Sequence, residues 1–235
     1  MEKIGILCAM DVEAELLRSR LTDRFPDLKA AGGTISRGKL SGHDVALTVC
    51  GIGKVNCAMS AQALIDLCQV DVLINTGIAG GLGEGLRTLD LVAAEQLVEH
   101  DFDLTAVGEP KGCVAGYEEG KPTYFPTSER LLNVYRKAAE YFTESRFWSG
   151  TIASGDMFLA NPAYKQSLRD NFHAIAGEME GVAAARVALA NGVESFVLRA
   201  ISDLADGDAA MTYDVFEKRA ADLSAHVLLR MIELL

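Results

Sequence analysis

The sequence predicts a three-layer α/β/α domain around a central mixed β-sheet. Short apolar runs typical of buried strands alternate with stretches of helical periodicity along most of the chain. A turn-rich tetrapeptide, residues 41–44, separates two strand-like runs and indicates an early antiparallel hairpin. The 235 residues, 49% of them hydrophobic, can bury one substantial core, so we expect residues 1–235 to form a single domain.

The amino-terminal half contains the hairpin and two strand–helix units. Apolar residues recur at helical spacing after the first strand, and a glycine-rich turn opens the second helix. A second such turn, Thr76–Gly81, is expected to end the last strand of this half. The expected elements are strand Ile4–Cys8, helix Asp11–Leu21, strands Ile35–Leu40 and Val45–Val49, a helix from Gly51 to about Cys68, and strand Val70–Asn75.

The carboxyl-terminal half continues the alternation after one irregular stretch, His100–Pro126. Its last helices include an alanine-rich segment that a glycine, Gly192, is expected to end. The expected elements are strand Leu89–Val98, helix Ser128–Phe142, strands Thr151–Ser154 and His173–Ala176, helix Met179–Asn191, strand Ser195–Ile201 and helix Tyr213–Leu235.

Composition excludes several classes of function. The 33 acidic and 22 basic residues give a net charge of −11, and no basic cluster is present, so nucleic acid and anionic membranes are not expected partners. Five cysteines without a C-x-x-C pair and four dispersed histidines predict neither disulfides nor a metal site. Residues 1–10 resemble neither a signal peptide nor a membrane span. We therefore expect a cytoplasmic protein.

Carboxylates directly follow three predicted strands, where ligands of open α/β sheets bind. Glu13 follows the first strand, Glu178 and Glu180 follow the strand ending at Ala176, and Asp203 follows the strand ending at Ile201. Simpler interpretations exist for each. Glu13 suits the first turn of a helix, Asp203 could begin a polar loop, and one of the paired glutamates could cap a helix. Two acids within an apolar, small-residue run still favour a functional role.

The glycine-rich turns do not predict a nucleotide cofactor. Gly51-Ile52-Gly53-Lys54 lacks the spacing of a P-loop, and Gly77–Gly85 lacks the spacing of a dinucleotide-binding turn. We expect these glycines to let the backbone turn tightly or approach a ligand closely.

Taken together, these motifs resemble the bacterial 5′-methylthioadenosine/S-adenosylhomocysteine nucleosidases of the purine nucleoside phosphorylase-like superfamily. The resemblance extends through nearly the whole chain. Its motifs are Ile4-Gly5-Ile6 with Ala9-Met10-x-x-Glu13, Gly51-Ile52-Gly53-Lys54-Val55, Asn75-Thr76-Gly77-x-Ala79-Gly80-Gly81, Ser154-Gly155-Asp156-x-Phe158, Glu178-Met179-Glu180 and Arg199-Ala200-Ile201-Ser202-Asp203-x-Ala205-Asp206.

This resemblance implies a purine nucleoside phosphorylase-like fold, hydrolysis of the N-glycosidic bond, and a role for each matched residue. Glu13 would activate the attacking water, and Asp203 would protonate N7 of the departing adenine. Glycosidic cleavage itself requires carboxylates near the sugar and an acid at the leaving base.

The other implied contacts surround the sugar, the base and the 5′ group. Glu180 would bind the ribose hydroxyls, Met179 would pack under the sugar, Phe158 would stack on the base and Leu159 would read its edge through the backbone. Arg199 and Glu178 would order the water and the carboxylates, and the substrate site would include Ala79, Gly80 and Ser202. The 5′-alkylthio group would be lined by Met10, Ile52, Tyr213 and, from the partner of a homodimer, Leu104 and Val107.

The sequence departs from the family pattern at Ile78, where better-known members often have serine, and in the loop 107–126. Three alternatives stay open: a hydrolase of futalosine or aminodeoxyfutalosine, a phosphorylase, and a nucleoside-binding protein without turnover. The acid at position 13 disfavours the phosphorylase, because it would repel an incoming phosphate. The presence of both Glu13 and Asp203 disfavours the binding protein.

Overall fold

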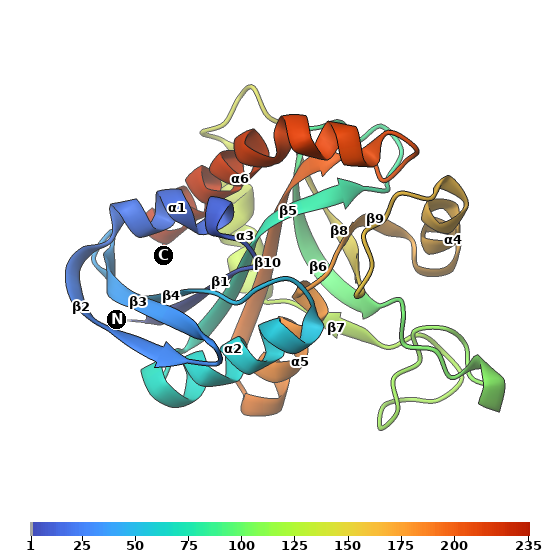
Figure 1. Ribbon diagram of the computed structural model, residues 1–235, viewed down its shortest axis with the longest axis horizontal. Helices are drawn as coiled ribbons and strands as arrows, with labels where there is room; N and C mark the ends of the chain where they lie inside the picture. Colours follow the sequence, from blue (N-terminus) through green and yellow to red (C-terminus); the bar gives the residue numbers. More distant parts are fainter. Residues whose placement is uncertain (1) are drawn as a thin grey trace.

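The computed structural model describes residues 2–235, so only Met1 of the expected domain lies outside the described residues. One sheet runs through the molecule (Figure 1). Its strands are β1 (Lys3–Cys8), β2 (Thr22–Ala30), β3 (Gly33–Leu40), β4 (His43–Val49), β5 (Val72–Gly81), β6 (Leu91–Glu99), β7 (Tyr124–Pro126), β8 (Phe147–Ser154), β9 (Ala174–Glu178) and β10 (Glu194–Asp203).

The sheet is mixed, as the sequence predicts. Its strand order is β10-β6-β8-β9-β5-β1-β4-β3-β2, with β7 on β6. Strand β1 pairs in parallel with β4 and β5, whereas β3 runs antiparallel to both β2 and β4. Strand β10 also pairs with β5, so five strands close into a ring while β1 to β4 extend from it.

Helices cover both faces of the sheet, which confirms the predicted three-layer arrangement. Helices α1, α3 and α6 pack on one face and α2 and α5 on the other, while α4 lies beside β8 and β9 (Figure 1). Their bounds are α1 (Asp11–Arg20), α2 (Lys54–Cys68), α3 (Glu129–Ala139), α4 (Pro162–Phe172), α5 (Gly181–Asn191) and α6 (Ala209–Glu233), and a short 3₁₀ helix, η1, covers Thr105–Val107.

Several helix boundaries follow from local capping. The Ser128 side chain accepts a hydrogen bond from the backbone N–H of Leu131 at the start of α3. Asn161 does the same for two N–H groups at the start of α4, where Pro162 occupies the first helical turn. Helix α5 ends at Gly192, which adopts the left-handed conformation that ends many helices.

The structure corrects the sequence prediction at both the edge and the centre of the sheet. The predictions missed β2, β7, η1 and α4. Strand β2 is an exposed edge strand that contains Pro26 and pairs only with β3, so its apolar pattern is weak. The segment Thr76–Gly81, expected as a turn, continues β5, because its glycines allow close packing rather than ending the strand. Helix α6 begins at Ala209 and not at Tyr213.

Within residues 2–235, no helix combines the length and apolar character that crossing a membrane requires. The segments that position the site come from the carboxyl-terminal ends of β1, β4, β5, β8, β9 and β10. All of them reach one pocket.

Candidate active site

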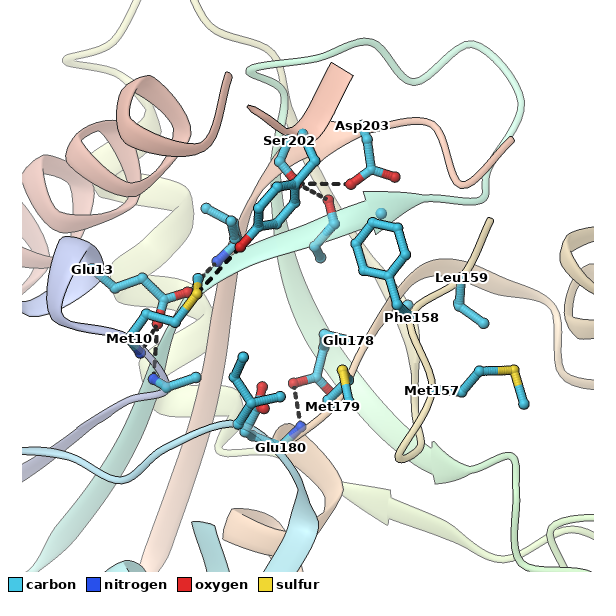
Figure 2. A pocket seen from close by; sticks show the side chains of 17 residues that line it. Met10, Glu13, Met157, Phe158, Leu159, Glu178, Met179, Glu180, Ser202 and Asp203 are labelled. Atoms are coloured by element: carbon cyan, nitrogen blue, oxygen red, sulfur yellow. Dashed lines mark hydrogen bonds between the residues drawn. The ribbon is translucent and has the colours of Figure 1, made fainter. Parts of the chain in front are cut away.

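One pocket brings together most of the residues that the sequence singles out. Figure 2 shows Met10 and Glu13 on one side, Met157, Phe158 and Leu159 on the other, and Ser202 with Asp203 above the paired glutamates. The lining residues are Ala9, Met10, Glu13, Ile52, Ile78, Ala79, Gly80, Met157, Phe158, Leu159, Gly177, Glu178, Met179, Glu180, Ser202, Asp203 and Tyr213.

Glu13 lies in the first turn of α1 and is almost completely buried. Its Oε2 accepts hydrogen bonds from the backbone N–H groups of Ala9 and Met10, at 2.8 and 3.0 Å, and its Oε1 accepts one from Ile78 at 3.0 Å. Burial raises the pKa of Glu13, while nearby Arg199 and these three donors act in the opposite direction. The carboxylate is therefore held in one orientation at the pocket wall.

Glu178, at the end of β9, forms a buried ion pair with Arg199 of β10. Its Oε2 also accepts hydrogen bonds from the backbone N–H groups of Glu180 and Gly181, at 3.0 and 2.7 Å, and its Oε1 contacts the Ser154 hydroxyl. Burial alone would raise the pKa of Glu178, but Arg199 and these donors hold that pKa below its ordinary value. Glu178 thus stays ionised and caps the start of α5.

Glu180 accepts a hydrogen bond from the backbone N–H of Gly53, at 2.8 Å, across the pocket floor. Burial and the neighbouring charge of Glu178 raise the pKa of Glu180 to about 7. The pKa values of the two glutamates therefore differ although the residues are two apart in sequence. This separation of pKa values is typical of carboxyl groups with different tasks in one site.

Asp203 lies at the end of β10 and is 2% exposed. Its Oδ1 accepts a hydrogen bond from the backbone N–H of Ala205 at 2.8 Å, and its Oδ2 accepts one from the Ser202 hydroxyl at 2.9 Å. Burial raises the pKa of Asp203, so its protonated form is more accessible than that of an ordinary aspartate.

Apolar and aromatic side chains form the remaining walls. The rings of Phe158 and Tyr213 meet edge to face with their centroids 5.7 Å apart. The Tyr213 hydroxyl lies 3.2 Å from the Met10 sulfur and donates a hydrogen bond to Glu217 at 3.0 Å. Flat aromatic surface beside buried carboxyl groups suits a ligand with an aromatic base and a polar sugar.

Three residues expected at the substrate do not line this pocket. Arg199 is fully buried behind Glu178 and reaches Asn75 as well, so it contacts the carboxylates and not the cavity. Leu104 and Val107 lie at η1, in the protruding segment between β6 and β7 (Figure 1), and Val107 is 75% exposed. The pocket is also lined by four residues that were not expected at the substrate, because none of them carries a titratable group: Ala9, Ile78, Met157 and Gly177.

The pocket has a strongly acidic lining. Glu13, Glu178, Glu180 and Asp203 reach it, and lysine, arginine and histidine are all absent from its walls. Within residues 2–235, no cluster of histidine, cysteine or acidic side chains has the arrangement of a metal site. The walls of the pocket present carboxyl groups, apolar side chains and aromatic surface.

The family model of the phosphorylase superfamily matches residues 3–233. The chain therefore belongs to the phosphorylase superfamily, whose members share this fold.

Its relatives define the class more narrowly. The chain is 38% identical over 232 residues to a 5′-methylthioadenosine/S-adenosylhomocysteine nucleosidase of Haemophilus influenzae (strain PittGG), covering 98% of this chain and 99% of the relative. The nucleosidase of the same name from Neisseria meningitidis, solved with methylthio-immucillin-A, is 32% identical with a TM-score of 0.94 and full coverage of both chains. A futalosine hydrolase of Helicobacter pylori is 33% identical with a TM-score of 0.93, covering 100% of this chain and 98% of that one. The resemblance to the nucleosidases is confirmed.

Proposed function

We propose that this chain is an N-glycosyl hydrolase that cleaves 5′-methylthioadenosine and S-adenosylhomocysteine, releasing adenine and the 5-thio-substituted ribose. The observation that carries the proposal is one pocket in which Glu13 and Asp203, both buried and both with raised pKa values, lie on different sides, with Glu178 and Glu180 below them (Figure 2). Two relatives that match this chain over nearly their full length are named as that nucleosidase.

Glu13 acts as the general base on the sugar side of the bond. Its carboxylate accepts three backbone hydrogen bonds, which fix its direction and oppose its protonation in a buried position. A water held against it gives up its proton as the water oxygen attacks the anomeric carbon. Carboxylates around the ribose also stabilise the positive charge that develops on the sugar.

Asp203 acts as the general acid on the base side. Adenine leaves poorly as an anion, so a proton delivered to N7 makes the bond easier to break. The raised pKa of Asp203 favours the protonated form that this step needs. Phe158 stacks on the adenine ring, and the backbone of Leu159 reads its edge.

The remaining residues bind and orient the ribose. Glu180 accepts hydrogen bonds from the ribose hydroxyls, and Met179 packs beneath the sugar. Glu178, ion-paired with Arg199, keeps the carboxylates and the water ordered without contacting the base. Further substrate contacts come from Ala79, Gly80 and Ser202, and the 5′ group packs against Met10, Ile52 and Tyr213.

Water, and not phosphate, is the nucleophile. Four acidic side chains line the pocket and none of its walls carries a lysine, arginine or histidine, so a phosphate dianion would be repelled. The test is the initial rate of adenine release from 5′-methylthioadenosine in phosphate-free buffer, compared with the rate in added phosphate. Equal rates support hydrolysis, whereas a strict phosphate requirement with a ribose 1-phosphate-type product would reject it.

We also propose that the chain works as a homodimer, with residues 1–235 as one nucleosidase domain in the cytoplasm. Ile52, Val55 and Met59 place exposed apolar side chains on one face at the start of α2, beside the pocket. A second copy that covers this face could bring its own Leu104 and Val107 to the 5′ end. Five free cysteines are typical of a reducing compartment.

A second candidate is hydrolysis of futalosine or aminodeoxyfutalosine. The likeness to the Helicobacter pylori futalosine hydrolase is as strong in fold as the likeness to the nucleosidases. Comparing kcat/KM for 5′-methylthioadenosine, S-adenosylhomocysteine and aminodeoxyfutalosine separates the two. A ligand-binding protein without turnover would release adenine from none of them.

A further inference from the structure

Two backbone segments on opposite sides of the pocket are joined behind it by polar side chains. The segment that starts α2 contributes Ile52 to the pocket wall, and the segment after β8 contributes Met157, Phe158 and Leu159. The backbone N–H of Lys54, in the first segment, donates a hydrogen bond to Oδ1 of Asp156, in the second, at 2.8 Å. One residue earlier, Gly53 donates to Glu180 at the pocket floor.

The Lys54 side chain extends this connection to the end of β6. Its Nζ donates hydrogen bonds to Oε1 of Glu99 at 2.8 Å and to Oδ1 of Asp101 at 2.5 Å, and it lies 3.9 Å from Oδ2 of Asp156. The second oxygen of Asp101 accepts the backbone N–H of Asp156 at 2.8 Å. Lys54 is thus the cation that holds the ends of β6 and β8 against the start of α2.

The charges around Lys54 make it difficult to replace. Its side chain is 17% exposed, and those of Glu99 and Asp101 are 8% and 22% exposed, so neither acid is well solvated. Arg186 also pairs with Glu99, but among the cations of residues 2–235 only Lys54 pairs with Asp101. Removing Lys54 would leave adjacent carboxylates facing one another in a partly buried position, and their repulsion would push the segments apart.

The contact between the two segments leaves no room for a side chain at position 53. Gly53 has a φ of +99°, and a Cβ atom at this position would lie 3.0 Å from Oδ1 of Asp156. The two segments therefore pack directly against each other at Gly53, and a shift of Asp156 is expected to disturb the bond from the Gly53 N–H to Glu180.

We propose that Lys54 is a positioning residue for substrate binding, acting through Gly53 on Glu180 and through Asp156 on the segment Met157–Leu159. The inference rests on the proposed nucleosidase function, in which Glu180 binds the ribose and the segment Met157–Leu159 binds the base. Lys54 does not line the pocket, so its effect passes entirely through these two hydrogen-bonded connections.

A positioning role predicts a change in pH dependence that loss of stability alone would not cause. The Gly53 N–H stabilises the ionised form of Glu180, so withdrawing it raises the Glu180 pKa and moves the acid limb of the kcat/KM profile to higher pH. The other charged or titratable groups that face Glu180 stay unchanged; they are Glu178 of β9, Arg199 of β10, Glu13 of α1 and Cys57 of α2.

The experiment compares Lys54→Met and Lys54→Arg with Arg146→Met. Arg146 is a matched control because it pairs with buried Asp90 at the opposite ends of the same two strands, β6 and β8, away from the pocket. KM, kcat and the pH profile are measured with 5′-methylthioadenosine, together with the melting temperature. Hydrogen–deuterium exchange of the peptides containing Gly53 and Asp156 gives a readout that needs no activity.

Lys54→Met is expected to raise KM by about tenfold or more, since small misplacements of binding groups have effects of this size. Lys54→Met should change kcat less than KM and move the acid limb of the kcat/KM profile to higher pH. It should also speed hydrogen–deuterium exchange in the peptides that contain Gly53 and Asp156. Lys54→Arg should have a KM close to that of the wild type. Arg146→Met should have a lower melting temperature, with KM and the acid limb of the kcat/KM profile unchanged.

The proposal would be overturned if Lys54→Met and Arg146→Met had the same KM, the same acid limb of the kcat/KM profile and the same rates of peptide exchange. If Lys54→Met does not fold, Asp156→Ala replaces it, because alanine removes the acceptor of the Lys54 N–H and the half-exposed Asp156 side chain tolerates the change. It is expected to show the same rise in KM, and a wild-type KM in this variant would also overturn the proposal. A wild-type protein that releases no adenine would reject the nucleosidase function instead, and the exchange data would still decide whether Lys54 holds the two segments.

Discussion

Oε1 of Glu13 lies only 2.2 Å from the position that a Cβ atom on residue 77 would occupy. The carboxylate of Glu13 therefore fills the space in which any other residue would place its side chain, and its bond to the Ile78 N–H depends on that space. Gly77 is a part of β5 for this reason, although glycine is unfavourable within strands.

Replacing Gly77 by alanine should displace Glu13 and remove turnover without unfolding the protein. We expect the rate of adenine release to fall by ~10² or more, within the range for loss of a general base. Gly150→Ala is the matched control, because its Cβ would meet only the flexible Ile175 side chain, 3.0 Å away. Equal activity of both variants would show that Glu13 need not occupy this position.

Replacing Glu13 by glutamine keeps the size of the side chain and removes the base. Turnover should fall by ~10²–10⁴, with the KM for 5′-methylthioadenosine changed much less. Steady-state kinetics with a direct assay of adenine measures both. Turnover close to that of the wild type would mean that Glu13 serves only the start of α1, as its position in the first helical turn allows.

The carboxyl ends of the strands and the edge strand β2 show how far the sequence alone could lead. The carboxylates that follow β1, β9 and β10 could be predicted to lie at a ligand site, because open α/β sheets bind ligands beyond the carboxyl ends of their strands. Strand β2 could not be predicted, since an exposed edge strand with a proline has no apolar alternation. Helix α4 had a usable signal in Asn161-Pro162, a capping residue followed by proline, although its apolar face is narrow.

The role of β5 and of the lysine behind the pocket depended on distant contacts. A run of glycines predicts a turn unless it is known which side chain occupies the space that the missing side chains leave. Here that side chain belongs to Glu13, 64 residues before Gly77. Lys54 forms hydrogen bonds with Glu99 and Asp156, which lie 45 and 102 residues away in the sequence. No local sequence pattern can predict contacts over such distances.

Glu180→Gln should change the pH dependence of stability in a defined direction. The pKa of Glu180 rises from 4.5 to about 7 in the folded chain, so between these values the folded state keeps a proton that the unfolded state has lost. Wild-type stability therefore declines as pH rises through this window, and a glutamine does not titrate. We expect the melting temperature of Glu180→Gln, relative to wild type, to increase from pH 4.5 to pH 7.

Thermal unfolding at several pH values measures this difference. Glu119→Gln, at an exposed position between β6 and β7, is the control for loss of one acidic side chain. A difference between Glu180→Gln and wild type that does not vary with pH would contradict the raised pKa of Glu180.

Val55→Glu should separate the proposed dimer. Val55 is 69% exposed and lies between Ile52 and Met59 on one face at the start of α2, so a charge there would be buried if a second copy covers this face. We expect the wild type to sediment as a dimer and Val55→Glu as a monomer with reduced activity. Phe25→Glu, exposed on the edge strand β2, should stay dimeric; a fully active wild-type monomer would refute the dimer.

Asp203→Asn tests the acid directly, because asparagine can accept the Ala205 N–H as aspartate does but cannot deliver a proton. The rate of adenine release should fall by at least ~10², the usual range for a general acid, with an unchanged melting temperature. Circular dichroism and kinetics with 5′-methylthioadenosine measure the two effects.

A riboside whose leaving group needs no protonation distinguishes acid catalysis from lost binding. If Asp203 supplies the proton to N7, this substrate should lose much less rate in Asp203→Asn than 5′-methylthioadenosine does, since its bond breaks without that proton. Equal losses for both substrates would mean that Asp203, fixed by Ser202 and Ala205, only positions the base. No loss for either would mean that the buried carboxyl group at the end of β10 serves the loop that follows it, and that the base leaves from another part of the pocket.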